Sequence, residues 1–484
     1  MSAVSVILAI VVVMLYVGIA LFIILDDGDS GWKVTWLLAI SLFPVLGLLF
    51  YLVMGVNYRR LGVRERLHAK VEKRFREEIP PERFNKLFLT DLSSGVAEKY
   101  RPLVSLLRSC YKGNILSEGN AAELITTGEK KWELLKQDIR EAREYIHMEY
   151  FRFGDDVAGR EIRDLLMVKA REGVKVRFVY EWFGNRLVPW RYYKEMREAG
   201  IEVARFTRLR NGLVNFWLRL NSRNHRKIVI IDGKVAYTGG MNLNNNYRYK
   251  WRDTHMRLQG PAIYALQASF LDTWLTSGGQ IKEPLGYFFP PEMPVGEAPL
   301  TGIPIQVVTD EPDFTYPHVQ LSYEWILQNA RDYVYIQTPY FGPPESVMNA
   351  LEAAALRGVD VRLLLPAKVD TPLIGPVNRS FFTECMEAGI RIYLWKGEFI
   401  HCKTLVSDDD LCLIGATNMD IRSFQINHEV DTFCYSREVA LAQKAIFLQD
   451  LENCIPLDLE GWKASRKWYK VLLGKVIRLA DGVL

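Results

Sequence analysis

The chain repeats a long part of itself, and this duplication limits the folds that it can adopt. Three stretches return in the same order later in the chain: YIHMEYFRF (145–153) as YIQTPYFGP (335–343), GVKVRFVY (173–180) as GVDVRLLL (358–365), and YYKEMREAGIEV (192–203) as FFTECMEAGIRI (381–392). Two copies are too few to build a solenoid, in which each unit stacks on its neighbours. We therefore expect two similar lobes related by a pseudo-two-fold axis.

The local patterns inside each copy are typical of an α/β fold. VKVRFVY and VDVRLLL are short runs, rich in apolar and β-branched residues, that follow a glycine as buried strands often do. The stretch before the first of them, residues 158–173, has the apolar spacing of a helix and ends at Gly173. Strands that alternate with helices predict a sheet covered on both faces. We place the first lobe at residues 126–300 and the second at residues 301–460.

A second repeated feature carries the candidate chemistry. NHRKIVIIDGKVAYTGGMN (224–242) and IHCKTLVSDDDLCLIGATN (400–418) both contain His-x-Lys followed by Asp, Gly and Asn at identical spacing. The residues in question are His225, Lys227, Asp232 and Asn242 in the first copy and His401, Lys403, Asp408 and Asn418 in the second. A single His-x-Lys would mean little. Two matched copies inside a wider duplication predict one composite site at the pseudo-two-fold axis.

This residue set suits the chemistry of a phosphodiester. On a strand, His225 and Lys227 point to the same face, so each copy offers an imidazole beside a fixed cation. One imidazole can attack phosphorus while the other protonates the leaving oxygen, and the lysines stabilise charge on the non-bridging oxygens. An imidazole titrates near pH ~6.5, so one neutral and one protonated ring can coexist near neutral pH. The scheme requires no metal and no cofactor, and the sequence shows no convincing ligand cluster for a metal.

Other polar residues extend the candidate site. Asn242 and Asn418 follow glycine-containing turns, and we expect their amides to bind the same phosphate. Asp253 and Glu429 each follow the histidine of their own copy at the same distance. A carboxylate in that position can hold an imidazole in the useful tautomer, so we expect both acids to support the histidines.

The two aspartates of the repeated motif have two possible roles. Asp232 has the wrong strand parity to share a face with His225, and it lies in an Asp-Gly turn. A role as a turn former or structural partner therefore competes with direct chemistry. The same alternatives apply to Asp408.

The N-terminal segment differs in kind from the rest of the chain. Residues 3–25 carry no charge, and after a short loop residues 34–56 form a second uncharged run that contains Pro44. Each run is long enough to cross a bilayer as a helix, and a proline can kink such a helix without preventing insertion. We expect residues 1–57 to form a two-helix transmembrane hairpin in the cell membrane.

The charges that flank these runs predict an orientation. The loop at 26–33 is acidic, whereas residues 57–76 are rich in Lys and Arg and begin a basic juxtamembrane and linker region at 58–125. The positive-inside rule then places the catalytic body in the cytoplasm. The six cysteines show no CxxC pairs or zinc-ligand spacing and are interpreted as reduced core thiols, as this location requires.

Two further segments combine bulky apolar side chains with basic ones. Residues 206–224, FTRLRNGLVNFWLRLNSRN, are either a packed loop or a flap that dips into the membrane interface. The C-terminal segment, residues 461–484, contains WKASRKWYKVLLGKVIRL, which either lies on an anionic surface or packs against the body. Both segments are compatible with lipid partners.

The duplicated constellation resembles the HKD motif of the phospholipase D superfamily. Two such motifs behind two N-terminal apolar spans resemble the bacterial cardiolipin synthases, and the likeness extends over essentially the whole chain. One departure is visible, because the superfamily often has Gly-Ser where this chain has Gly239-Gly240 and Gly415-Ala416. Any phosphate contact from that serine hydroxyl is therefore absent or replaced by backbone.

The resemblance implies two phospholipase D-like lobes and a phosphatidyl transfer. One phosphatidylglycerol gives its phosphatidyl group to a histidine and releases glycerol. A hydroxyl of a second phosphatidylglycerol then attacks the phosphohistidine and yields cardiolipin. Superfamily precedent favours His225 as the nucleophile and His401 as the acid and then the base. The expected partners are phosphatidylglycerol and other anionic membrane lipids.

Four other functions compete with this one. Water as acceptor would make the chain a phospholipase D, and serine would make it a phosphatidylserine synthase. The motifs do not separate these, because pocket shape and water exclusion choose the acceptor. A nuclease is disfavoured by the membrane hairpin and by a net charge of only +4, so we expect no nucleic-acid partner. A catalytically silent lipid-binding scaffold is disfavoured by two intact motifs.

Overall fold

The computed structural model describes most of the chain as two compact units. The described residues are 3–25, 30–51, 55, 73–75, 77–79, 95–206, 222–290, 298–371 and 374–478. The N-terminal helices belong to one unit, and the two lobes together belong to the other. Three expectations fall wholly or largely outside these residues: the basic run at 57–76, nearly all of the flap at 206–224, and the last residues of the C-terminal segment.

The N-terminal unit contains α1 (Ala3–Leu25), α2 (Ser30–Leu42) and α3 (Pro44–Phe50). The uncharged run at 34–56 was expected to form one helix, but the described part of it divides at Pro44, which starts α3 because proline cannot continue the hydrogen-bond pattern of a preceding helix. Ile23, Ile40 and Tyr51 form a small buried cluster. None of the helices that the structure describes is long and apolar enough to cross a membrane.

The first lobe alternates strands and helices. Its strands are β1 (Leu116–Ile125), β2 (Tyr145–Tyr150), β3 (Lys175–Glu181), β4 (Glu202–Phe206), β5 (Lys227–Ile231), β6 (Val235–Gly239) and β7 (His255–Gln259). Its helices are α7 (Gly128–Glu141), α8 (Val157–Arg171), α9 (Trp190–Glu198), α11 (Asn245–Tyr249) and α12 (Ala262–Thr276), followed by the short η4 (Leu285–Phe288). In the range described from residue 95, η3 (Glu98–Tyr100) and α6 (Arg101–Cys110) precede β1.

The second lobe repeats this order with additions. Its strands are β8 (Leu300–Asp310), β9 (Tyr333–Gln337), β10 (Phe341–Gly342), β11 (Asp360–Pro366), β12 (Arg391–Trp395), β13 (Thr404–Ser407), β14 (Leu411–Gly415), β15 (Met419–Asp420), β16 (Glu429–Cys434) and β17 (Cys454–Pro456). Its helices are α13 (His318–Asn329), α14 (Glu345–Leu356), α15 (Ile374–Ser380), α16 (Phe382–Glu387), α17 (Ile421–Gln425), α18 (Arg437–Leu451), α19 (Leu459–Ser465) and α20 (Trp468–Arg478).

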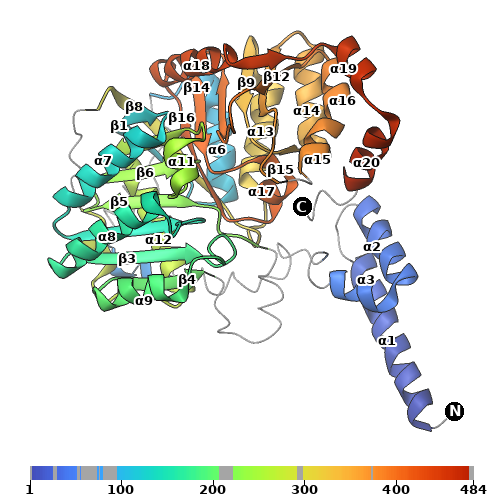
Figure 1. The fold of residues 1–484 in the computed structure, drawn as a ribbon, viewed down its shortest axis with the longest axis horizontal. Coiled ribbons are helices and arrows are strands. Elements are labelled where there is room, and N and C mark those ends of the chain that lie inside the picture. Colours follow the sequence, from blue (N-terminus) through green and yellow to red (C-terminus); the bar gives the residue numbers. More distant parts are fainter. Residues whose placement is uncertain are drawn as a thin grey trace. The chain divides into compact units, whose positions relative to one another are not determined.

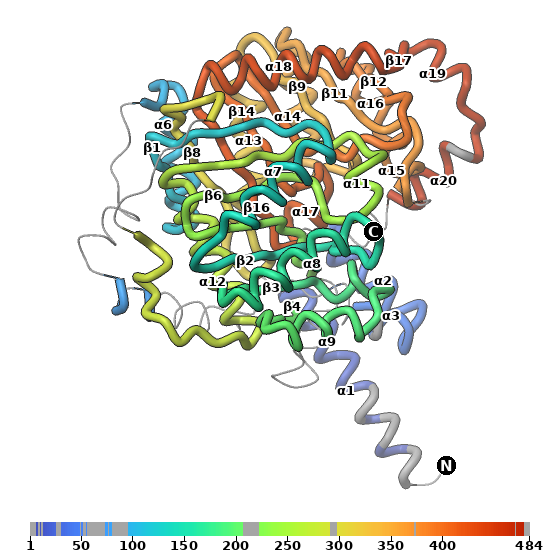
Figure 2. The backbone as a smooth tube through the Cα atoms, turned by 60° about the vertical axis from the view of Figure 1, so that its left-hand side comes forward, coloured from blue at the N-terminus to red at the C-terminus, as the bar shows by residue number. Residues whose placement is uncertain are grey.

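A single mixed sheet runs through both lobes (Figures 1 and 2). Outward from the centre, the first lobe contributes β1-β7-β6-β5-β2-β3-β4 and the second contributes β8-β16-β14-β13-β9-β11-β12-β17. The two orders correspond strand for strand, with β17 added at one edge, so the duplication read from the sequence is present in the topology. β1 and β8 pair antiparallel at the centre and join the lobes. β1 ends at Ile125, so the boundary expected at 126 leaves the innermost strand out of the first lobe.

The glycines shared by the two copies end equivalent helices. Gly173 follows α8 and Gly358 follows α14, and both have a φ of 96°. A left-handed residue of this kind lets the chain leave a helix and enter the next strand, and only glycine adopts it without a steric cost. The GVKV and GVDV segments recur because each lobe makes this turn before its second parallel strand.

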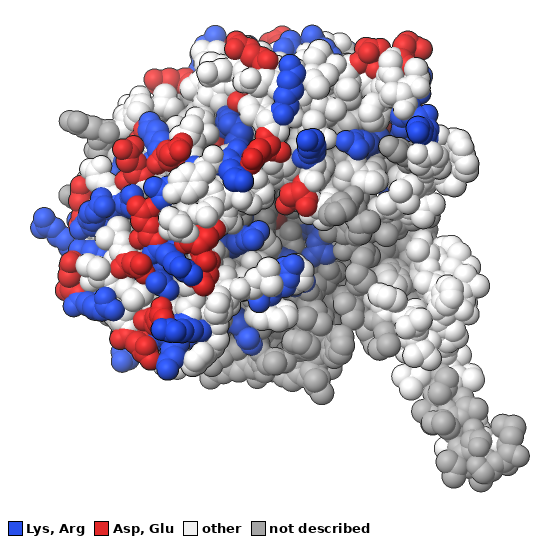
Figure 3. Space-filling view, in the orientation of Figure 1, with Lys and Arg blue, Asp and Glu red and all other residues white. Residues whose placement is uncertain are grey.

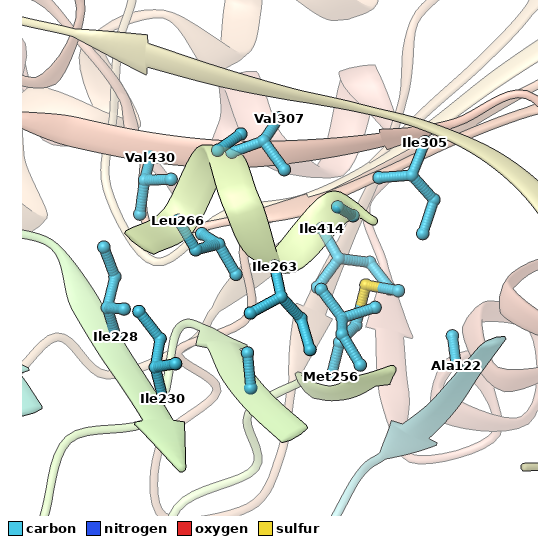
Figure 4. Packing of buried hydrophobic residues seen from close by; sticks show 14 of the residues in the cluster. Ala122, Ile228, Ile230, Met256, Ile263, Leu266, Ile305, Val307, Ile414 and Val430 are labelled. Atoms are coloured by element: carbon cyan, nitrogen blue, oxygen red, sulfur yellow. The ribbon is translucent and has the colours of Figure 1, made fainter. Parts of the chain in front are cut away.

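Both faces of the sheet are buried, which explains its strongly apolar strands. In β5, Ile228 and Ile230 point into a cluster shared by the two lobes, whereas Val229 and Ile231 point into a cluster of the first lobe. Figure 4 shows Ile263 and other α12 residues packed among strands of both lobes. Full burial of one such side chain contributes roughly 1.5–3 kcal/mol. The shared cluster therefore fixes the two lobes against each other. The six cysteines are free, and all except Cys110 are buried.

Candidate active site

The two histidines lie at equivalent points just before β5 and β13, and not on a strand as expected. Backbone hydrogen bonds connect each of them to the opposite lobe. The His225 N–H donates to the carbonyl of His428 at 2.9 Å, and the His401 N–H donates to the carbonyl of Arg252 at 2.7 Å. Isolated parallel bridges connect the same segments. Each histidine is thus fixed to the residue that directly precedes an acid of the opposite lobe. The structure therefore brings the two motifs together at the pseudo-two-fold axis.

The acids are exchanged between the lobes. His225 Nδ1 lies 3.0 Å from both carboxylate oxygens of Glu429, and His401 Nδ1 lies 2.8 Å from Asp253 Oδ2. Each histidine therefore has the acid of the other copy as its partner, which spacing along the chain did not reveal. A carboxylate that accepts the Nδ1 proton leaves Nε2 as the nitrogen available for attack or proton transfer.

The two lysines lie beside the imidazoles and are fully buried. Lys227 Nζ and Lys403 Nζ each donate to the carbonyl of the histidine two residues earlier at 2.5 Å. Lys403 Nζ also lies 3.0 Å from His401 Nε2. Burial lowers the pKa of Lys227 to about 7 and that of Lys403 to about 8.

Burial and neighbouring charges also shift the pKa values of the remaining members. Burial, followed by the charges of the two lysines, lowers the pKa values of both His225 and His401 well below the ordinary value. Burial raises the pKa of Asp253 to about 6 and that of Glu429 to about 7. An anionic phosphodiester would favour the charged forms of the lysines and histidines, because it adds the negative charge that this buried group of cations lacks.

Asn242 and Asn418 occupy equivalent positions in the two copies and are held by similar contacts. Asn242 Nδ2 donates to the Tyr247 hydroxyl at 2.8 Å, and Asn418 Nδ2 donates to Ser423 Oγ at 3.2 Å. Tyr247 and Ser423 each follow their asparagine at the same distance. The Tyr247 hydroxyl also lies 3.3 Å from His401 Nε2, so the first lobe reaches the histidine of the second. Sequence reasoning missed Tyr247, although this shared spacing was a usable signal.

The surroundings of the two rings differ. The His401 ring is surrounded by aromatic rings with centroids 5.1 to 6.3 Å away, those of Tyr247, Trp251, Phe399 and Tyr340. The His225 ring meets the Phe151 ring edge-on, with centroids 5.1 Å apart. The two halves of the site share a scaffold but not an environment.

The motif aspartates brace the backbone. Both oxygens of Asp232 accept backbone N–H groups, those of Arg143, Glu144 and Tyr145, at 2.8–2.9 Å. Asp408 makes the equivalent contacts with Arg331, Asp332 and Tyr333 at 2.9–3.1 Å. Both aspartates have a φ of 52° at the turn between paired strands. These contacts support the structural alternative for Asp232 and Asp408, which fix the start of β2 and β9.

The departure at Gly239-Gly240 has a steric cause. A Cβ at position 240 would lie 2.2 Å from Asp253 Oδ1, the carboxylate that serves His401. A side chain there would displace this acid, so a serine does not fit as the chain stands. Within the part of the chain that the structure describes, no group of three His, Cys, Asp or Glu side chains is placed to hold a metal ion.

Comparison with solved structures shows where this fold occurs elsewhere. The phosphatidylserine synthase of Haemophilus influenzae Rd KW20 superposes with a TM-score of 0.59, over 78% of this chain and all of that one, at 15% identity. At this identity the similarity concerns the fold alone.

Comparison of sequences is more specific. A family model described as "Cardiolipin synthase, PLD-like domain" matches residues 135–274 and again residues 324–451, one range in each lobe. A cardiolipin synthase of Halalkalibacterium halodurans is 31% identical over 100% of this chain and 94% of its own length. The major cardiolipin synthase ClsA of Bacillus subtilis is 35% identical over 92% of each chain. The chain therefore belongs to the cardiolipin synthase family of enzymes, with two phospholipase D-like domains.

Proposed function

We propose that this protein condenses two phosphatidylglycerol molecules into cardiolipin and glycerol through a phosphohistidine. The observation that carries the proposal is the crossed pair of His–acid contacts, which builds one site from both lobes. Two imidazoles, each with its own carboxylate and lysine, match a reaction in which one ring carries the phosphatidyl group and the other moves the proton.

In the first half-reaction, His225 Nε2 attacks the phosphorus of one phosphatidylglycerol. The N–P bond forms as the P–O bond to glycerol breaks, and the departing oxygen takes a proton from His401. Glu429 stabilises the positive charge that develops on the His225 ring, and Lys227 and Lys403 stabilise the non-bridging oxygens.

In the second half-reaction, His401 acts as the base. It takes the proton from a terminal hydroxyl of the second phosphatidylglycerol, whose oxygen attacks the phosphohistidine and releases His225. Tyr247 and Lys403 surround His401, and this environment suits the ring that gives and takes protons. One phosphodiester replaces another, so no nucleotide is needed to drive the exchange.

Membrane attachment is part of the proposal. The uncharged runs at 3–25 and 34–56 and the basic run at 57–76 support a two-helix anchor in the cell membrane with the catalytic body in the cytoplasm. The substrates are lipids, so an enzyme held at the bilayer meets them directly. Cysteine labelling from either side of sealed vesicles tests the orientation, and labelling of the body from outside intact cells would contradict it.

The activity test uses the purified full chain and phosphatidylglycerol alone in mixed micelles. Cardiolipin and free glycerol should appear in equal amounts, and His225→Ala and His401→Ala should each remove both products. Phosphatidic acid in place of cardiolipin would identify water as the acceptor. Phosphatidylserine formed only when serine is added would identify a serine acceptor.

A further inference from the structure

We propose that Arg186, Arg223 and Arg422 form a second phosphate site beside His225, which binds the phosphodiester of the acceptor phosphatidylglycerol. This inference rests on the proposed function and names the residues that choose the acceptor. The chemistry of the proposed reaction requires a second phosphate site. The attacking hydroxyl and the phosphate of the acceptor lie at opposite ends of one glycerol, so a second anion must rest near the phosphohistidine during attack.

The backbone brings arginines of both lobes to one place. Arg223 lies two residues before His225, and its carbonyl accepts the His428 N–H at 2.8 Å. The carbonyl of Arg422, in α17, accepts the N–H of the neighbouring Asn427 at 2.9 Å. Backbone hydrogen bonds therefore attach Arg223 and Arg422 to two consecutive residues, 427 and 428. These directly precede Glu429, the acid partner of His225. Arg422 also lines a small pocket with Asp420 and Tyr340.

A loop of the first lobe supplies the third cation. The Phe183 ring lies between two guanidinium groups, with Arg223 at 4.3 Å and Arg186 at 4.5 Å from its centre. Such stacking holds the planar guanidinium groups and leaves N–H donors for a ligand, although one donor of Arg186, Nη1, already binds the carbonyl of Phe183 at 3.1 Å. Arginine binds phosphate through two parallel N–H donors, so this cluster offers the geometry that a phosphodiester requires.

Two acids near these cations, Glu181 and Asp420, also accept backbone N–H groups, and the charge of Glu181 offsets part of the charge of Arg223. Glu181 accepts the Gly184 N–H at 2.6 Å, and Asp420 accepts the Ser423 N–H at 2.7 Å. Burial raises the pKa of Glu181 to about 7 and that of Asp420 to about 6, so their negative charge is weakened. Burial, and then the charge of Arg223, lowers the pKa of Arg422 to about 10. A bound anion would relieve this repulsion.

The face of the first lobe shown in Figure 3 is not broadly basic. On the face shown in Figure 3, Lys and Arg residues of the first lobe are interspersed with Asp and Glu, in keeping with a net charge of +4 over the whole chain. General attraction of anions therefore does not account for a guanidinium cluster beside His225.

Exposed apolar side chains on the same loop and at the start of α9 favour a lipid over free phosphate. Trp182, Leu187 and Trp190 are 42%, 83% and 70% exposed. Asn185 ties the loop to the first motif, because its Nδ2 donates to the carbonyl of Phe151 at 2.8 Å, and the Phe151 ring contacts His225. Acyl chains of a lipid can cover these side chains while its phosphate meets the arginines.

The test compares two reactions of the full-length enzyme in phosphatidylglycerol micelles. One is condensation to cardiolipin, and the other is exchange of radiolabelled glycerol into phosphatidylglycerol, whose acceptor carries no phosphate. Arg422→Gln should lower condensation roughly ten- to a hundredfold, the effect of losing a charge-assisted contact, and leave exchange nearly unchanged. Arg223→Gln should act in the same direction. Arg437→Gln, at an exposed arginine of α18, is the matched control and should change neither reaction.

The possible failures are distinguishable. If the wild type exchanges glycerol but makes no cardiolipin, the proposed function fails. If the wild type makes cardiolipin and Arg422→Gln does so equally well, the second site fails alone. If Arg422→Gln loses both reactions equally, Arg422 acts in donor binding or in folding, and the proposed second phosphate site is wrong. Inorganic phosphate at millimolar concentration should inhibit neither reaction, and selective inhibition of condensation would identify a free-phosphate site instead.

Discussion

The two halves of the active site have kept one scaffold and acquired two environments. The bracing aspartates make the same three backbone contacts in both lobes. Around the reacting rings the copies differ: Tyr247 in the first lobe corresponds to Ser423 in the second, and among the described residues more aromatic rings lie around His401 than around His225. The residues that fix the backbone have thus stayed equal, whereas those that contact the rings have diverged. Such a difference is expected if one ring carries the phosphatidyl group and the other moves protons.

The largest effect should come from separating the two histidines with an activated donor. Phosphatidyl-p-nitrophenol has a leaving group that needs no acid, so His401→Ala should still release nitrophenol in a burst and form the covalent enzyme. His225→Ala should form none. With phosphatidylglycerol, loss of the acid should slow turnover by roughly 10²–10⁴-fold. Rapid-quench measurement of labelled protein checks the assignment, and the reverse pattern would exchange the two roles.

The crossed acids provide the next comparison. Asp253→Asn should impair His401, and Glu429→Gln should impair His225, each by about a hundredfold, because the imidazole loses the group that orients it. The double variant His401→Ala with Asp253→Asn should be little worse than His401→Ala alone. The double variant His401→Ala with Glu429→Gln should react clearly more slowly than His401→Ala alone when phosphatidyl-p-nitrophenol is the donor. If the couplings instead followed the pairs within each copy, the crossed contacts would have no functional role.

A smaller effect should separate Tyr247 from Ser423. Tyr247→Phe removes a hydroxyl 3.3 Å from His401 Nε2, so we expect a loss of about tenfold in turnover, the size of one or two hydrogen bonds. Ser423→Ala should cost less, because Ser423 has no contact with a histidine ring among those the structure describes. The pH profile of kcat/KM should shift in Tyr247→Phe only. An unchanged profile would limit the tyrosine to a packing role.

The smallest effect on catalysis, and an equal one in both lobes, should come from the bracing aspartates. Asp232→Asn and Asp408→Asn keep a residue that tolerates a positive φ but weaken the acceptor of three backbone N–H groups. Each should lower the free energy of unfolding by roughly 1.5–3 kcal/mol and leave the turnover of the folded enzyme almost intact. Thermal unfolding in detergent, together with activity per folded molecule, measures both. A large loss of turnover at full stability would restore the catalytic interpretation.

Much of this site could be predicted from the sequence, because its main signals are local. The duplicated motif identifies the two His-Lys pairs directly, and the Asp-Gly turn already indicated a structural role for Asp232. The strand-parity argument does not apply, because His225 and Asp232 both lie outside β5. The supporting acids were found by their equal spacing, but their exchange between lobes was not. That exchange depends on the pairing of segments far apart in the chain, such as His225 with His428, and no local pattern encodes it.

Other features were missed for identifiable physical reasons. β1 reads LSEGNAAELI, which lacks the apolar alternation of a half-buried strand, so its membership of the first lobe was not predicted. Tyr247 lies in a helix of five residues, too short to show a periodic pattern. The run at 34–56 carries no charge, and a kink at Pro44 was considered, but the start of a separate helix at that residue was not predicted.

The central pairing of β1 with β8 has a consequence for how the reaction must proceed. A row of backbone hydrogen bonds between β1 and β8 joins the lobes. The lobes therefore cannot open and close by a hinge motion unless these hydrogen bonds break. The separation of the two imidazoles is therefore set by main-chain geometry before any lipid arrives. Released glycerol must therefore leave, and the second lipid must enter, while the two lobes and the phosphorylated ring stay in place.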